Sequence, residues 1–256
     1  MFDRPYLKDR AKDRLRAGSG NVILVLFLAG LLGGSSSSLL TFHFNFQMSS
    51  DSLSLDLPHS FIAIFTGVLL LIAAAGILYT LFFANVLEVG VQGWCLRYAR
   101  GEYPPIGEFF CGFRLYLPAF KTMLLRDLFL FLWSLITCGI MGVVKGLAYS
   151  MTGYILCENP NLSPSRALQM SDILTNGAKM DLFVFELSYI GWALLSTLTC
   201  GILGILYVNP YRATAHAGIY DALKDTAIRS GKLTWEDFGQ LPPSIPPQGM
   251  PYPTFG

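Results

Sequence analysis

The chain is poor in charged residues. Only 14% of its 256 residues are Asp, Glu, Lys or Arg, and 53% are hydrophobic, whereas an average soluble domain is about 25% charged. Such a composition cannot build a water-facing surface of ordinary polarity. The hydrophobic excess lies in apolar runs that approach the roughly 20 residues a membrane-spanning helix needs. Because backbone facing lipid must satisfy its own hydrogen bonds, these runs are expected to be helical. The sequence therefore predicts an all-α, polytopic transmembrane helical bundle.

Residues that carry metal and redox chemistry are also scarce. The chain has 3 His and 5 Cys, with no CxxC pair, so neither a zinc site nor a disulfide framework is expected. The motifs HExxH, GxSxG, GxGxxG and the P-loop are missing. We therefore expect no cofactor and no enzymatic activity. No basic surface stands apart from the cationic loops, so no nucleic-acid partner is expected.

Lysine and arginine are missing from residues 41–60, and this gap sets the predicted orientation. Residues 1–20 carry 6 Lys or Arg, and a further group lies in 88–126. The positive-inside rule then puts the N-terminus and the second connection in the cytoplasm, with 41–60 outside. The first span is expected over 21–40 and the second from Phe61. The basic, apolar start also resembles a secretory signal, so removal of the first span remains an alternative.

The number of later spans has two solutions. The apolar stretch between Leu117 and Cys157 has a core of about 30 residues, or about 45 Å as one helix, which exceeds a hydrocarbon core of about 30 Å. Either one tilted span protrudes, or the chain turns near "CGIMG", where Gly139 and Gly142 favour a break. Another span is expected over 182–208, followed by a turn at Asn209–Pro210 and a possible final return. Six spans are favoured by the charge distribution, and four are the alternative.

The segments that flank these spans have signals of their own. Ser163, Pro164 and Gly177 predict the ends of a short helix, which we expect to be an amphipathic surface helix between the later spans. From Leu233 onward the proline-rich sequence predicts an extended tail. The expected organisation is a cytoplasmic basic amphipathic segment (1–20), a transmembrane domain (21–228) and a cytoplasmic proline-rich tail (229–256). In the first segment Leu7, Ala11 and Leu15 share one helical face.

Two ionisable residues lie within apolar runs, where a charge is costly and therefore suggests a role. Glu186 has three interpretations: an anchor at the interface or partner of Lys179, a proton- or cation-handling group, or one half of an interhelical ion pair. Lys145, the other candidate, could pair with Glu186 in the four-span topology but not in the six-span one. Arg97, Arg100 and Arg114 are candidate contacts to anionic lipid headgroups.

Several stretches resemble a family of uncharacterised bacterial integral membrane proteins, domain of unknown function 975. The resemblance runs from about residue 7 to 224, although members typically carry a Pro-Gly pair where this chain has "TCGIMG". It implies a bacterial cell membrane protein and no activity. The stretches that carry it are "LKDRAKDRL", "VGVQGWCLRYARGE", "GFRLYLP", "LFLFLWSLIT", "KGLAYSMTGYILCENPNLSPSRALQMSDILTNG" and "LFVFELSYIGWALLSTLTCGILGILYVNPYRATAHAGIY".

The functional expectation is a non-enzymatic accessory, regulatory or transport-associated component of the bacterial cytoplasmic membrane, with both termini in the cytoplasm. Its expected partners are the lipid bilayer, anionic headgroups, and another membrane protein or a second copy bound through small-residue helix faces such as Gly142 and Gly146. The alternative is a membrane-embedded enzyme acting on lipid or envelope substrates, which requires carboxylates or histidines clustered at one interface.

Overall fold

The computed structural model describes residues 4–31, 59–137, 139–199 and 203–240. All regular elements in these ranges are helices, as the apolar runs predict. In chain order they are α1 (Arg4–Leu31), α3 (His59–Tyr79), the π-helical η1 (Thr80–Ala84), α4 (Asn85–Arg100), η2 (Ile106–Phe110), α5 (Cys111–Arg114), α6 (Tyr116–Ile136), α7 (Ile140–Tyr149), α8 (Thr152–Glu158), α9 (Pro164–Thr175), α10 (Lys179–Leu187), α11 (Ile190–Leu198), the π-helical η3 (Gly204–Val208), α12 (Asn209–Arg229) and η4 (Glu236–Phe238).

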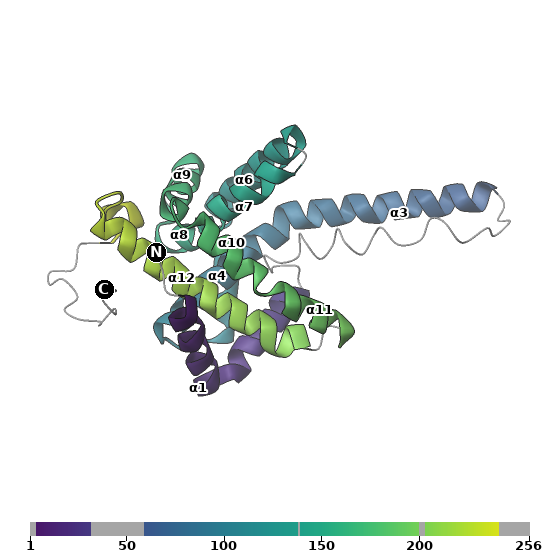
Figure 1. Cartoon of the computed structure of the whole chain (residues 1–256). Coiled ribbons are helices and arrows are strands. Elements are labelled where there is room, and N and C mark those ends of the chain that lie inside the picture. Colours follow the sequence, from purple (N-terminus) through teal and green to yellow (C-terminus); the bar gives the residue numbers. More distant parts are fainter. Residues whose placement is uncertain (1–3, 32–58, 138, 200–202, 241–256) are drawn as a thin grey trace.

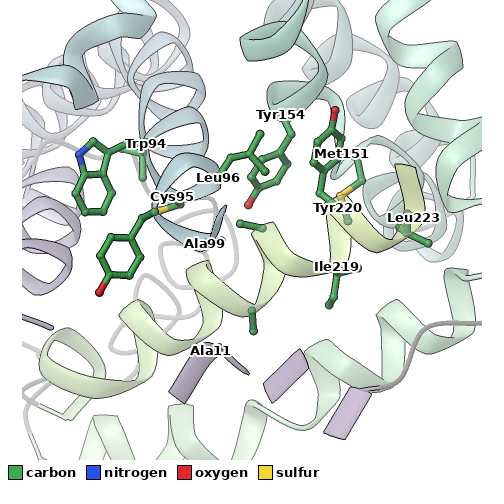
Figure 2. Packing of buried hydrophobic residues seen from close by; sticks show 14 of the residues in the cluster. Ala11, Trp94, Cys95, Leu96, Ala99, Met151, Tyr154, Ile219, Tyr220 and Leu223 are labelled. Atoms are coloured by element: carbon green, nitrogen blue, oxygen red, sulfur yellow. The ribbon is translucent and has the colours of Figure 1, made fainter. Parts of the chain in front are cut away.

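The helix α4 lies at the centre of the packed body of the protein. It contacts α1, α8 and α12, and all its residues except Arg97 and Arg100 are buried. Small residues let the neighbouring backbone come close: a Cβ on Gly90 would meet the carbonyl oxygen of Phe109 at 2.1 Å, a distance that no real side chain occupies. Large side chains of α4, α8 and α12 fill the remaining space, as Figure 2 shows for Trp94, Leu96 and Tyr220 and their neighbours.

Other helices project from this body with apolar surface uncovered. Every residue from Phe65 through Thr80 is exposed, and Figure 1 shows α3 extending alone to the right. The α6–α7 hairpin and α11 likewise present exposed leucine, phenylalanine and isoleucine. Two helical stretches are long and apolar enough to cross a membrane, Phe65–Arg100 and Lys179–Leu198. The all-helical class is therefore confirmed, whereas six spans are not: by length and composition alone, two stretches could cross a membrane.

The predicted break and the predicted short helix are both present. The chain turns between α6 and α7 at Gly139, whose φ of 90° lies in the left-handed region that favours glycine. The helix α9 begins at Pro164 after Ser163 and is followed by Gly177 with φ 92°. Its apolar side, however, packs against α6, α7 and α8 of the protein itself, with Ala167 and Leu168 buried.

Two boundary predictions were wrong. No turn occurs at Asn209–Pro210: the π-helical η3 continues directly into α12, so Pro210 lies within one continuous helical stretch. Helix α11 ends at Leu198 and packs against η3, and residues 200–202 between them lie outside the described residues. The extended tail also begins later than Leu233. Leu233 and Phe238 are 2% and 0% exposed, because these apolar side chains precede the first proline of the tail and join the core.

The first helix crosses the predicted boundary at residue 20 without a break. Leu7 and Ala11 are buried as one face, but that face packs on α12, where Leu7 lies 3.5 Å from the position of a Cβ on Gly218. The side chain of Leu15 lies outside the described residues, as do residues 41–58 of the predicted outer segment 41–60 and the tail beyond residue 240. His59 and Ser60 of that segment begin α3.

Candidate functional site

A buried ionic network joins α4, α8 and α12, and Glu158 is at its centre. Glu158 ends α8, at the point where the apolar run of residues 151–157 gives way to the turn before α9. Its side chain is 5% exposed, as is that of Lys224. Helix α12 supplies Tyr220, Asp221 and Lys224 within about one turn, so all three reach the end of α8 together.

Every oxygen of the Glu158 carboxylate receives at least one charged or hydroxyl donor. Arg100 Nη2 lies 2.5 Å from Oε1, while Lys224 Nζ and Tyr220 Oη lie 2.6 and 2.7 Å from Oε2. The Arg100 guanidinium also contacts Asp221 Oδ1 at 2.7 Å. Two carboxylates and two cations therefore neutralise one another in the network.

The C-terminal segment closes the network from outside. Gln240 accepts a hydrogen bond from Lys224 at 3.0 Å and donates one to Glu158 at 3.3 Å. The Lys224 ammonium lies 4.5 Å from the ring centroid of Phe238, a cation–π distance. The residues that follow α12 are thereby fixed to its last turns and to α8.

The pKa values of the three α8 and α12 groups follow from burial and pairing. Burial raises the pKa of Glu158, but its ion pairs with Lys224 and Arg100 outweigh burial and hold the pKa below the ordinary value. Burial lowers the pKa of Lys224 despite the attraction of Glu158. The Asp221 carboxyl has its pKa raised, since burial outweighs its contact with Arg100. The network is a charge-balanced clamp rather than a set of free acid and base groups.

A second polar cluster lies between α4 and α6. Arg126 forms a bidentate pair with Glu88, with both N···O distances 3.2 Å, and its Nε lies 3.0 Å from Asp127. Asn85 donates to Asp127 at 2.5 Å. Next to it, Gln92 donates to Glu88 at 3.0 Å. A planar guanidinium between two carboxylates is the geometry that makes arginine suited to buried pairs.

The two ionisable residues singled out in apolar runs do not meet. Glu186 pairs with Arg212 of α12 at 2.6 Å, and His216 Nε2 lies 3.8 Å from its other oxygen. Lys145 instead lies 3.4 Å from Asp172 of α9. Of the three interpretations of Glu186, the geometry matches the interhelical ion pair, with a different partner from the one considered.

Lys179, the alternative partner considered for Glu186, shares Asp172 with Lys145. Its Nζ lies 2.7 Å from Asp172 Oδ1. Burial raises the pKa of Asp172, but the hydrogen bond from Lys179 and the charge of Lys145 outweigh it, so the pKa is lowered. The structure thus places Lys145 beside the short helix α9.

The three arginines named as headgroup candidates have different surroundings. Arg97 is on the surface and pairs with Glu102 at 2.6 Å and with Glu108. Arg100 belongs to the Glu158 network. Arg114 is exposed, and among the described residues it forms no ion pair.

The chemistry available to these clusters is limited by their internal pairing. In the described part of the chain no group of three or more His, Cys, Asp or Glu side chains is placed to hold a metal ion. Burial raises the pKa of the Cys157 thiol, so this sulfur is protonated and unreactive at neutral pH. Fixed, neutralised ion pairs hold helices together and do not present a reactive group to a substrate.

Sequence reasoning missed the Glu158 network because its members are far apart in the chain. Arg100 was considered a headgroup contact, and no local pattern links it to Glu158. One signal was present: Tyr220, Asp221 and Lys224 place a hydroxyl and charges of both signs within about one helical turn.

Residues 134–227 match the model of a family described as "Protein of unknown function (DUF975)". The resemblance expected from the sequence is confirmed over this stretch, which runs from the end of α6 nearly to the end of α12. It includes Glu158, Lys224, Glu186 and Arg212, whereas Arg100 lies before it. No match was found among curated proteins or among solved structures.

Proposed function

We propose that this chain is a multi-pass protein of a bacterial cell membrane, where it acts as a non-enzymatic accessory, regulatory or transport-associated component. The observation that carries this proposal is the uncovered apolar surface of α3, in which every residue from Phe65 through Thr80 is exposed. Monomeric soluble proteins rarely expose contiguous apolar patches beyond a few hundred Å². Lipid is the solvent in which such a helix is stable.

The orientation follows from where the charges gather. The Glu158 network and α9 lie toward the end of the molecule that also holds the C-terminal end of α12, whereas the tips of α3, the α6–α7 hairpin and α11 point the other way (Figure 1). Arg100 belongs to the first of these ends through its contact with Glu158, and Arg166 of α9 through its contact with Asp237. Positive-inside bias then supports cytoplasmic N- and C-termini. Six passes would require both later hairpins to reach the outer face.

A non-enzymatic role is supported by the state of the polar groups. An enzyme acting on lipid or envelope substrates needs an acid, a base or a nucleophile that is free to react. Glu158, Asp221 and Glu186 are instead each held by a cation at 2.5–2.7 Å. This pairing favours the accessory role over the enzyme alternative.

The membrane location is tested by expressing the full chain and washing the membranes with alkaline carbonate. Retention of the protein in the pellet is expected, and release into the supernatant would contradict the proposal. The headgroup role is tested at Arg114 by native mass spectrometry with anionic lipid. Arg114→Gln is expected to retain fewer anionic lipids than the wild type. Arg166→Gln is the matched control, because Arg166 already pairs with Asp237 at 2.9 Å.

A further inference from the structure

Partly exposed charged residues limit how deeply α3 and the two later hairpins can enter a bilayer. A charged side chain in hydrocarbon is costly and has to be covered by protein or reach the headgroups. Lys145 and Asp172 are 23% and 37% exposed, and Glu186 and Arg212 are each 26% exposed. These pairs are therefore expected to lie at the level of the headgroups or beyond it, toward water.

In the α6–α7 hairpin, the helix between the last charged residues, Asp127 and Lys145, and the tip is short. From Leu128, which follows Asp127, to Ile136 at the end of α6 there are about nine residues, or about 13 Å of helix. The return arm is shorter: the residues from Ile140 to Val144, which precede Lys145, span about 8 Å. The outer face of this tip is apolar, with Phe131 and Leu135 67% and 68% exposed.

The hairpin formed by α10, α11 and η3 is similar. Its two arms are joined by the Glu186–Arg212 pair, and just past that pair the ammonium of Lys8 on α1 lies 2.8 Å from the hydroxyl of Ser188. The part of the outgoing arm without a charged contact therefore runs from Ile190 to Leu198, over about 13 Å. The return through η3 to Tyr211 is shorter. Leu194 and Leu198 near the tip are 69% and 81% exposed.

The helix α3 differs from both hairpins. From Phe65 through Ala84 it and η1 have no charged residue, a length of about 30 Å, which equals a whole hydrocarbon core of about 30 Å. Half of that core is about 15 Å, which is close to the length of the uncharged part of the outgoing arm in each hairpin. We propose that the α6–α7 and α10–η3 hairpins enter only the cytoplasmic leaflet and turn back within it, while α3 crosses the bilayer.

This proposal rests on the proposed membrane location and replaces two pairs of complete spans by two re-entrant hairpins. Irregular backbone at the tips is tolerated at that depth only where it is covered. The turn after α6 meets this requirement in part: Thr137 hydrogen-bonds through its hydroxyl to the carbonyl of Trp133 at 2.7 Å, and Gly139 N–H to the carbonyl of Ser134 at 2.9 Å. The exposed side chains next to both turns, such as Leu135 and Leu198, are apolar, and the proposed occupant of these faces is lipid acyl chain.

The test is cysteine accessibility in the full chain, with its five native cysteines replaced. Single cysteines are introduced at the tips as Thr137→Cys and Thr199→Cys. Two controls report the two sides of the membrane: Ser50→Cys in the predicted outer segment, and Asn161→Cys, exposed before α9. A membrane-impermeant maleimide is applied to intact cells and to inverted vesicles.

Both tip cysteines are expected to react at least about tenfold more slowly than the matching control from either side. With a bimane label at these positions, lipids carrying doxyl deep in the acyl chain are expected to quench more than lipids carrying it near the headgroup. Labelling of a tip from outside at the rate of Ser50→Cys would overturn the proposal and establish complete spans. Protection without doxyl quenching would also overturn it, because a second copy or another protein would then cover the tips. Release of the protein by carbonate is a separate result that refutes the membrane location itself.

Discussion

Replacing Glu158 by glutamine tests whether the ionic network is the clamp that holds α4, α8 and α12 together. Glutamine keeps the shape of the side chain but removes the negative charge that faces Arg100 and Lys224. Breaking a buried pair from one side costs about 3–5 kcal/mol, because the other charge stays buried without its partner. Asp221 still accompanies Arg100, so we expect a loss of about 3 kcal/mol in the free energy of unfolding.

The measurement is thermal unfolding of the detergent-solubilised full chain, followed with a thiol-reactive fluorogenic dye. The buried Cys95, 2% exposed, becomes reactive only as the body unfolds. A chain of this size shifts its Tm by about 2–4 °C per kcal/mol, so Glu158→Gln is expected to lower Tm by about 6–12 °C. The control is Glu102→Gln, which removes an exposed partner of Arg97 and is expected to cost less than about 1 kcal/mol. Equal Tm values for the two variants would refute the clamp.

Further predictions concern acid, pairing, packing and the C-terminal segment. Because the folded pKa of Glu158 lies below its ordinary 4.5, its stabilisation is complete above that pH and is lost as pH falls through the folded pKa, so the Tm difference between wild type and Glu158→Gln should shrink from pH 6 to pH 3. A double-mutant cycle of Glu186→Gln with Arg212→Gln should give a coupling of about 0.5–3 kcal/mol in unfolding experiments, and a coupling near zero would contradict the ion pair. Gly153→Ala should destabilise by about 1–3 kcal/mol, since the new Cβ would lie 1.9 Å from a glutamine oxygen of α4; an unchanged Tm would contradict that close packing. Truncation after Lys232 should lower Tm markedly by removing buried apolar side chains, while truncation after residue 240 serves as the control and should match the full chain.

Local signals predicted the helical class and the ends of some helices, but α1 crosses the boundary predicted at residue 20, and the turn predicted at Asn209–Pro210 does not occur. The run from Phe61 was predicted to be helical because it is apolar over the length that a membrane-spanning helix needs. Helix α9 was predicted from Pro164 at its start and Gly177 after its end. Gly139 marked the break after α6, and the structure places a left-handed residue there. These features depend on a few neighbouring residues, so they are visible in a single sequence.

Contacts between distant residues were not predictable in the same way. Glu158 and Lys224 are 66 positions apart, and no local pattern joins them. Glu186 was considered with Lys145 and Lys179, but its partner Arg212 lies beyond a point where the sequence wrongly predicted a turn. Phe238 shows a related limit: it was assigned to a proline-rich tail by composition, although its apolar ring fills a site on α12 that only the folded chain creates.

Helices α3, η1 and α4 form one continuous rod from Phe65 to Arg100, and this continuity has a mechanical consequence. One end of the rod is bare apolar surface, while the other carries Arg100 into the ionic network. A bilayer that grows thicker or thinner changes the preferred tilt of a spanning helix, and a stiff rod passes that rotation to its far end. Only η1, where the hydrogen-bond ladder widens to the π spacing, offers a joint at which the rotation can be absorbed. In the proposed membrane location, any rotation that η1 does not absorb would reach Arg100 and its contact with Glu158.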